Sequence, residues 1–202
     1  MQTNKRMPIV TLVKLALLSS MLITIPAQAA WRLNNDQSNL SFISIKASDI
    51  AEVHRFNTLA GTIEDDGSVN VEIELASVDT LIPIRDQRMR EVLFETNAFP
   101  IASITAKIDP ALAENLSAGE ITTVTAEVLV ELHGEAAPTV IELDFVSLTD
   151  TRILVSSQKP VIVNAGMFNL VDGIEQLREI AGLPSISKAV PVSFRLIFDQ
   201  EN

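Results

Sequence analysis

Short stretches in which apolar and polar residues alternate dominate this chain. The clearest spans residues 69–75, which read Val-Asn-Val-Glu-Ile-Glu-Leu. A period of two predicts a β-strand with one dry face and one wet face. Residues 65–68 read Asp-Asp-Gly-Ser, and Asp-Gly beside alternating residues is a strong hairpin signal. We therefore expect a tight turn there, preceded by a strand over about 55–64.

The same alternation recurs along the rest of the chain. It begins at residues 40–45 and returns in a long stretch, 121–133. A turn at 134–138 and a returning strand follow, then further strands: 139–148, 152–156 and 190–198. The pattern as a whole predicts about eight strands in hairpin order.

Two stretches depart from this rhythm and predict helices. Residues 84–96 are mostly good helix formers. Within 170–181, Leu170, Ile174 and Leu177 recur at spacings of three or four, as on the apolar face of an amphipathic helix. Gly182 is placed to end this second helix.

Strands with one apolar face, and no long helices to cover them, must bury that face against one another. They can do so as a sandwich or as a closed barrel, and closure also removes exposed strand edges. Periodicity predicts an all-β domain but does not decide between the two.

The first 30 residues have the features of a secretory signal peptide. Basic residues Lys5 and Arg6 precede an apolar stretch, 15–25, and then Ala27 and Ala29 in an A-x-A arrangement. We expect cleavage after Ala29, giving a signal peptide over 1–29 and one domain over 30–202. The apolar stretch is too short to span a bilayer comfortably, which takes roughly 20 apolar residues.

Composition excludes several classes of function. The chain has no cysteine, which rules out disulfides and thiolate metal sites. Its formal net charge of −11 would become −14 on cleavage, because Lys5, Arg6 and Lys14 are lost. So acidic a chain lacks the basic patch that nucleic-acid binding requires.

Catalytic and metal-binding patterns are missing as well. The two histidines, His54 and His133, are far apart and lack ligand spacing, so we expect loop-end histidines with structural hydrogen bonds and no metal site. There is no nucleophile elbow, zinc-protease motif or phosphate-binding loop. We therefore expect neither an enzyme nor a bound cofactor.

Charged residues crowd the first predicted helix, which carries Arg85, Asp86, Arg88, Arg90 and Glu91. They could pair within the helix on a solvated face, where such pairs are worth only tenths of a kcal/mol. Alternatively, the helix is a mouth or lid that meets a head group or a partner, and Arg85 or Asp86 ties it to the strands.

Several strings occur in the order found in one known family. They are 61–63 (Gly-Thr-Ile), 76–80 (Ala-Ser-Val-Asp-Thr) followed by Arg85, Asp86 and Arg90, then 93–94 with 99–100, 132–134 (Leu-His-Gly) and 190–194 (Val-Pro-Val-Ser-Phe). Taken together, they resemble the YceI-like polyisoprenoid-binding family. Where many relatives carry a His-Ser pair, residues 36–40 contain no histidine.

The resemblance implies a single antiparallel eight-stranded lipocalin-like barrel with two short inserted helices. It also implies a periplasmic protein that holds an isoprenoid-like lipid, of polyprenyl or quinone type, in the barrel lumen. A transient contact with a membrane or a membrane protein is left open, as is the oligomeric state, a homodimer included. The alternative is an envelope stress or interaction protein, not an enzyme, whose barrel is filled by side chains.

An eight-stranded barrel either fills its interior or leaves room for one small ligand. The residues expected to point inward, and under the resemblance to contact the lipid, are Phe42, Val71, Ile73, Leu75, Ile104, Val128, Val130, Leu143, Phe145, Phe194 and Leu196.

Overall fold

The computed structural model describes residues 1–2, 31–114 and 117–201. The predicted signal peptide, apart from its first two residues, and its cleavage site lie outside these residues. In the part described, no helix is both long enough and apolar enough to cross a membrane.

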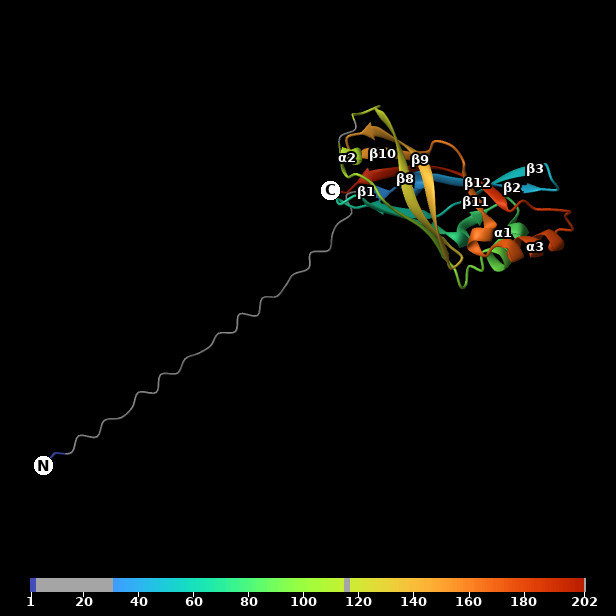
Figure 1. Cartoon of the computed structure of the whole chain (residues 1–202), viewed down its shortest axis with the longest axis horizontal. Helices are drawn as coiled ribbons and strands as arrows, with labels where there is room; N and C mark the ends of the chain where they lie inside the picture. Colours follow the sequence, from blue (N-terminus) through green and yellow to red (C-terminus); the bar gives the residue numbers. More distant parts are fainter. Residues whose placement is uncertain (3–30, 115–116, 202) are drawn as a thin grey trace.

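Strands make up most of the described domain (Figure 1). Those before the first helix are β1 (Trp31–Leu33), β2 (Asn39–Lys46), β3 (Ile50–Phe56), β4 (Leu59–Ile63), β5 (Ser68–Glu74) and β6 (Val78–Asp79). Those after it are β7 (Ile101–Lys107), β8 (Ile121–Leu132), β9 (Glu135–Thr149), β10 (Arg152–Ser157), β11 (Val161–Asn164) and β12 (Ala189–Gln200).

Short helices separate some of these strands. The α-helices are α1 (Pro83–Arg88), α2 (Ala111–Glu114) and α3 (Val171–Ile180), and α1 continues into a π-helical segment η3 (Met89–Leu93). Three single 3-10 turns complete the set: η1 (Asn35–Gln37), η2 (Leu75–Ser77) and η4 (Ala165–Phe168). The two predicted helices correspond to α1 with η3 and to α3.

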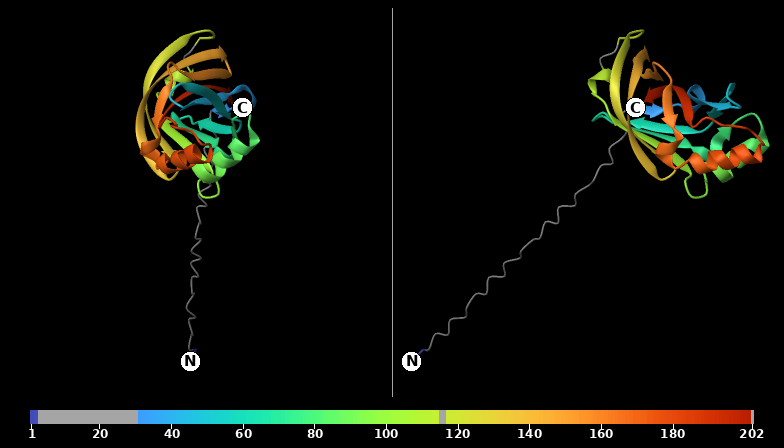
Figure 2. Two further views of the ribbon diagram at one scale, coloured as in Figure 1. Left: turned by 90° about the vertical axis from the view of Figure 1, so that its right-hand side faces the viewer. Right: turned by 45° about the vertical axis from the view of Figure 1, so that its right-hand side comes forward.

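The sheet closes into an antiparallel barrel, as the resemblance implied. Around the ring the order is β1, β4, β5, β7, β8, β9, β10 and β12, and β12 pairs with β1 to complete the circle. Within the described residues the closed ring therefore has eight strands. β2, β3 and β6 extend the sheet from β12 beyond the ring, at the end that also carries α1 and α3 (Figures 1 and 2).

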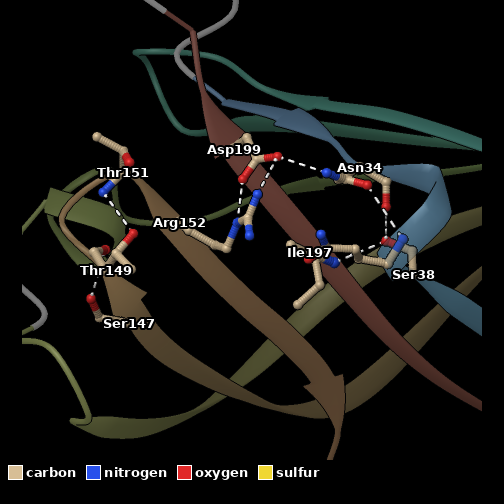
Figure 3. A network of polar contacts seen from close by, with 9 residues as sticks. Asn34, Ser38, Ser147, Thr149, Thr151, Arg152, Ile197 and Asp199 are labelled. Atoms are coloured by element: carbon tan, nitrogen blue, oxygen red, sulfur yellow. Dashed lines mark hydrogen bonds and ion pairs between the residues drawn. The ribbon is translucent and has the colours of Figure 1, made fainter.

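Polar contacts fix the opposite end of the barrel, near the C-terminus (Figure 3). Arg152 donates two hydrogen bonds to Asp199, with Nε 2.6 Å and Nη2 3.1 Å from the carboxylate oxygens. The Asn34 amide donates to the same carboxylate at 2.8 Å, which joins β10 and β12 to the η1 turn. Ser38 Oγ accepts from the Ile197 amide at 2.9 Å. This network holds the chain where β1 breaks before β2.

Two strand boundaries predicted from the pattern are wrong. The strand expected over 55–64 is two strands, β3 and β4, because the chain breaks at Asn57 and Thr58, whose amides both donate to Ser77 Oγ. The turn expected over 134–138 is shorter, because β9 already begins at Glu135.

Two residues make that turn instead. His133 and Gly134 have φ values of 52° and 79°, the positive values that a tight hairpin turn favours. Pro138 lies within β9 opposite Leu129 of β8, beyond the point where β10 pairs with β9. Proline has no N–H to donate to a neighbouring strand, and it is tolerated at such a free edge because no neighbouring strand needs that hydrogen bond.

Candidate ligand cavity

The barrel encloses a cavity of about 460 Å³. This volume lies within the range of roughly 300–1,000 Å³ typical of small-molecule sites. All eleven residues predicted to point inward line it: Phe42, Val71, Ile73, Leu75, Ile104, Val128, Val130, Leu143, Phe145, Phe194 and Leu196. Their position in the lumen is observed, and contact with a lipid stays a prediction.

Alternation along the strands puts ten of these residues inside, and Leu75 enters the lumen from the start of the η2 turn, directly after β5. In β5, Val71 and Ile73 are buried and line the cavity, whereas Glu72 and Glu74 are exposed outside the barrel. The pairing register then aligns apolar positions across the barrel wall, since Val71 lies opposite Ile104 of β7 and Ile104 opposite Val130 of β8. The predicted period of two therefore builds a continuous apolar lining.

Helix α3 and segment η3 cover one end of the lumen. Leu170 and Ile174 are buried and line the cavity, as does Leu93 of η3. The two segments approach closely at Gly173, where a Cβ atom would lie 2.8 Å from the Val92 carbonyl oxygen and 3.0 Å from Leu93 Cα. The amphipathic face predicted for this helix therefore caps the barrel.

The opening of the cavity lies beside these helices. Ile82, Ile84 and Ala181 line the cavity and are also exposed to solvent, so they mark its rim. Ile82 and Ile84 stand at the start of α1, and Ala181 at the end of α3. The β2–β3 hairpin flanks the same end (Figure 2), where the Lys46 strand end forms a bridge with Ile186.

A small polar cluster interrupts the apolar lining at this mouth. Glu52 of β3 is the centre of it: Lys46 Nζ of β2 lies 2.7 Å from Glu52 Oε2, and Arg85 Nη1 of α1 lies 2.8 Å from the same oxygen. Arg85 Nη2 also donates to the Thr80 carbonyl at 2.7 Å. His54 of β3 is buried, and its Nε2 atom shares a 2.8 Å hydrogen bond with Ser44 Oγ.

Burial and charge shift the titration of this cluster. The pKa of His54 is lowered from its ordinary value, first because burial disfavours the imidazolium and second because the Arg85 guanidinium is near. The hydrogen bond from Lys46 lowers the pKa of the Glu52 carboxyl, and the Arg85 charge adds to this effect. At neutral pH the mouth therefore holds a neutral imidazole beside an ionised carboxylate.

The expectation that His54 ends a loop is wrong. His54 lies inside β3 with only 4 % of its surface exposed, and its ring centroid is 5.2 Å from that of Phe42. His133 does lie in a turn, with its Nε2 atom 2.9 Å from Glu95.

Three mouth residues were not singled out as site residues from the sequence, namely Lys46, Glu52 and His54. A signal for them exists: the inward alternation of Leu40, Phe42 and Ser44 in β2 continues to Lys46. Because β2 pairs with β3 in an antiparallel register, Ser44 lies opposite Glu52 and Phe42 opposite His54. The inward face of the β2–β3 hairpin, followed to its end, therefore leads to Lys46, Glu52 and His54.

The charged helix α1 forms contacts with the strands as well as contacts within the helix, the two alternatives that its sequence left open. Arg85 ties α1 to β3 through Glu52, and Asp86 accepts from the Thr80 amide at 2.8 Å. By contrast, Gln87 and Glu91 form a hydrogen bond within the helical segment on its exposed side. Arg85 and Arg88 line the cavity, so this part of the helix is a wall of the mouth.

The fold and the cavity together define a lipocalin-like barrel with a ligand-sized apolar lumen. A YceI-like domain model matches residues 31–198, which is most of the chain. The protein therefore belongs to the YceI-like family, as the strings in its sequence indicated.

Solved structures agree with this assignment. The polyisoprenoid-binding domain from Saccharophagus degradans implicated in plant cell wall breakdown is 37 % identical, with a TM-score of 0.85 over 86 % of this chain and 100 % of that one. BcnA of Burkholderia cenocepacia is 14 % identical, with a TM-score of 0.64 over 82 % and 98 %. The YceI protein of Campylobacter jejuni is also 14 % identical, with a TM-score of 0.55 over 74 % and 85 %.

The last two similarities show the fold alone. Among curated protein sequences, none matches this chain.

Proposed function

We propose that this protein is a periplasmic carrier that holds an isoprenoid-like lipid, of polyprenyl or quinone type, in the barrel lumen. The cavity of about 460 Å³ inside a closed barrel is the observation that carries the proposal. The similarity to a domain described as polyisoprenoid-binding supports the same class of ligand.

The energetics of the lumen suit an apolar chain. Each buried methylene contributes about 0.8 kcal/mol, so the five carbons of one isoprene unit contribute about 4 kcal/mol. Because the lining is almost wholly apolar, a few units could offset the entropy lost on association without any polar contact. Tail length and lumen width would then set specificity.

The carrier role rests on export as well as on the cavity. The signal features of residues 1–29 direct the domain to the periplasm, and an apolar lipid cannot cross that aqueous compartment alone. Neither the residue types of the sequence nor their arrangement in the part that the structure describes points to catalysis, and we propose a binding protein that is not an enzyme. The interaction-protein alternative expects a filled barrel, which the cavity does not favour.

Exchange of the lipid would take place at the rim. Leu81, Ile82 and Ile84 are exposed apolar residues at the start of α1, and Leu81 is 81 % exposed. Exposed apolar residues around a lipid-binding mouth favour a brief contact with a membrane or a membrane protein during loading.

A transfer assay tests the proposal. Donor vesicles carrying a fluorescent polyprenol are mixed with unlabelled acceptor vesicles, with and without the protein. A carrier should raise the transfer rate in proportion to protein concentration, and Ile84→Asp should lower that rate. Transfer that does not respond to the protein contradicts the carrier role.

A further inference from the structure

The outer face of the sheet beside the mouth is apolar. Alternate residues of β2, β3, β11 and β12 line the cavity, so the residues between them point outward. The apolar residues among these form three cross-strand pairs, which are Ile43 with Val53, Ile45 with Ala51, and Ile162 with Pro191. Because β2 also pairs with β12, the three pairs belong to one surface, which we call the lateral face.

The lateral face lacks the negative charge of the rest of the protein. The chain has 26 acidic and 15 basic residues. The outward positions of β2, β3 and β11, and of β12 as far as Arg195, nevertheless hold no carboxylate. They hold two arginines instead. Arg55 pairs with Asp79 of β6, whereas Arg195 forms no ion pair within the part of the chain that the structure describes.

The outer wall formed by β5 and β8 has the opposite character. Each of these strands is the third from β12 around the ring, one in either direction. Their outward positions include four exposed acids that form no ion pair with any described residue, namely Glu72, Glu74, Glu127 and Glu131. Charge is therefore distributed unevenly around the barrel, and the lateral face can approach a negatively charged surface that the acidic wall would be repelled by.

The lateral face and the cavity mouth share one hairpin. Glu52 and His54 of β3 line the cavity, and Val53 between them points to the lateral face with 65 % of its surface exposed. Ile50, at the tip of the same hairpin, is exposed as well. The hairpin projects at the end of the barrel that carries α1 and α3 (Figure 2). A partner that binds the lateral face is therefore brought next to the mouth.

We propose that the lateral face docks the protein on a phospholipid bilayer, with Val53 and Ile162 entering the interfacial region and Arg195 at the level of the phosphates. Interfacial binding takes an apolar surface with basic residues at its edge, whose aliphatic stems lie along the apolar region while the charged ends reach the phosphates. Docking in this way would hold the mouth at the membrane surface, where a lipid can enter without crossing water. The inference rests on the proposed function for its purpose and adds the docking surface and its partner.

Co-sedimentation with vesicles of phosphatidylethanolamine and phosphatidylglycerol tests this docking. The exported protein should sediment with the vesicles, and Val53→Asp should weaken its partitioning at least about tenfold, because an apolar contact is lost and a charge is placed in the interface. Val140→Asp is the matched control. Val140 is an outward-facing valine of β9 that is 63 % exposed but lies outside the lateral face, so its change should leave the partitioning unaltered.

Two further measurements separate insertion from attraction between charges. Because the whole chain is acidic, added salt should leave vesicle binding unchanged or strengthen it, and a loss of binding on adding salt would overturn insertion as the basis of docking. The one tryptophan of the chain, Trp31, is buried. Val53→Trp therefore adds an exposed reporter whose fluorescence brominated lipid should quench, whereas quenching of Val140→Trp to the same extent would overturn the assignment of the surface.

The remaining outcomes distinguish this inference from the carrier proposal. Failure of the unchanged protein to bind these vesicles overturns the docking, and so does an equal loss for Val53→Asp and Val140→Asp. A dimer that Val53→Asp dissociates, seen by analytical ultracentrifugation, would assign the lateral face to a second copy and overturn it as well. Geranylgeraniol affinity measured without vesicles should not change in Val53→Asp, since Val53 lies outside the cavity. If the unchanged protein binds vesicles but no geranylgeraniol, the docking is upheld and the carrier role is overturned.

Discussion

Enlarging one small side chain in the lumen should displace ligand without harming the fold. Ala106 of β7 lines the cavity between Val69 and Val128. Ala106→Leu adds three carbon atoms to the lumen, and at about 0.8 kcal/mol per displaced ligand carbon the loss is about 2.4 kcal/mol. We therefore expect an affinity for a lumen-filling polyprenol about 60-fold weaker than that of the unchanged protein.

The same variant tests whether the lumen is empty in the free protein. Extra carbon atoms in a filled core cost about 1–3 kcal/mol through overpacking, whereas in a cavity they have room. Chemical denaturation of the free variant should therefore show an unfolding free energy equal to or above that of the unchanged protein. The control is Ala60→Leu on β4, where the side chain is exposed and neither quantity should change.

Destabilisation of the free Ala106→Leu protein by 1–3 kcal/mol, at the size expected for overpacking, together with unchanged polyprenol affinity, would refute the reasoning. The barrel would then be filled at this position, and the ligand would bind elsewhere.

Three further predictions concern the mouth, the cap and the N-terminus. Burial holds the folded-state pKa of His54 below its ordinary value of 6.5, so the unfolding free energy should fall as pH drops from 6.5 through that pKa, and His54→Gln should flatten the fall; an equally steep fall in His54→Gln would contradict this. Gly173→Ala should lower the unfolding free energy by about 1–3 kcal/mol, because its Cβ would meet the backbone of η3, and an unchanged denaturation midpoint would contradict this packing. Intact-mass measurement of exported protein should give Ala30 as the first residue, and an uncleaved chain would contradict the signal-peptide prediction.

The sequence predicts those parts of the fold that depend on local pattern. Alternation identifies β5 and β8 and sends residues such as Val71 and Val128 into the lumen, because side chains along a strand face opposite sides. The spacing of Leu170, Ile174 and Leu177 likewise identifies the apolar face of α3. Barrel closure itself came from the family resemblance, since alternation fits a sandwich equally well.

The missed features depend on contacts between distant parts of the chain. The break between β3 and β4 is fixed by Ser77, about twenty residues away, while the alternation continues through the break. Likewise, the polar mouth forms only when Glu52 meets Arg85 of a different element. The burial of His54 likewise depends on the neighbouring strand β2, whose Phe42 lies opposite it and whose Ser44 shares a hydrogen bond with its ring.

Native mass spectrometry followed by organic extraction tests the central claim most directly. The protein is purified from the periplasm of the cells that make it, its intact mass is recorded under native conditions, and any bound molecule is extracted and identified. We predict a bound mass that extracts as an isoprenoid-like lipid. An unliganded mass, together with no uptake of added polyprenol, polyprenyl phosphate or quinone, would contradict the account.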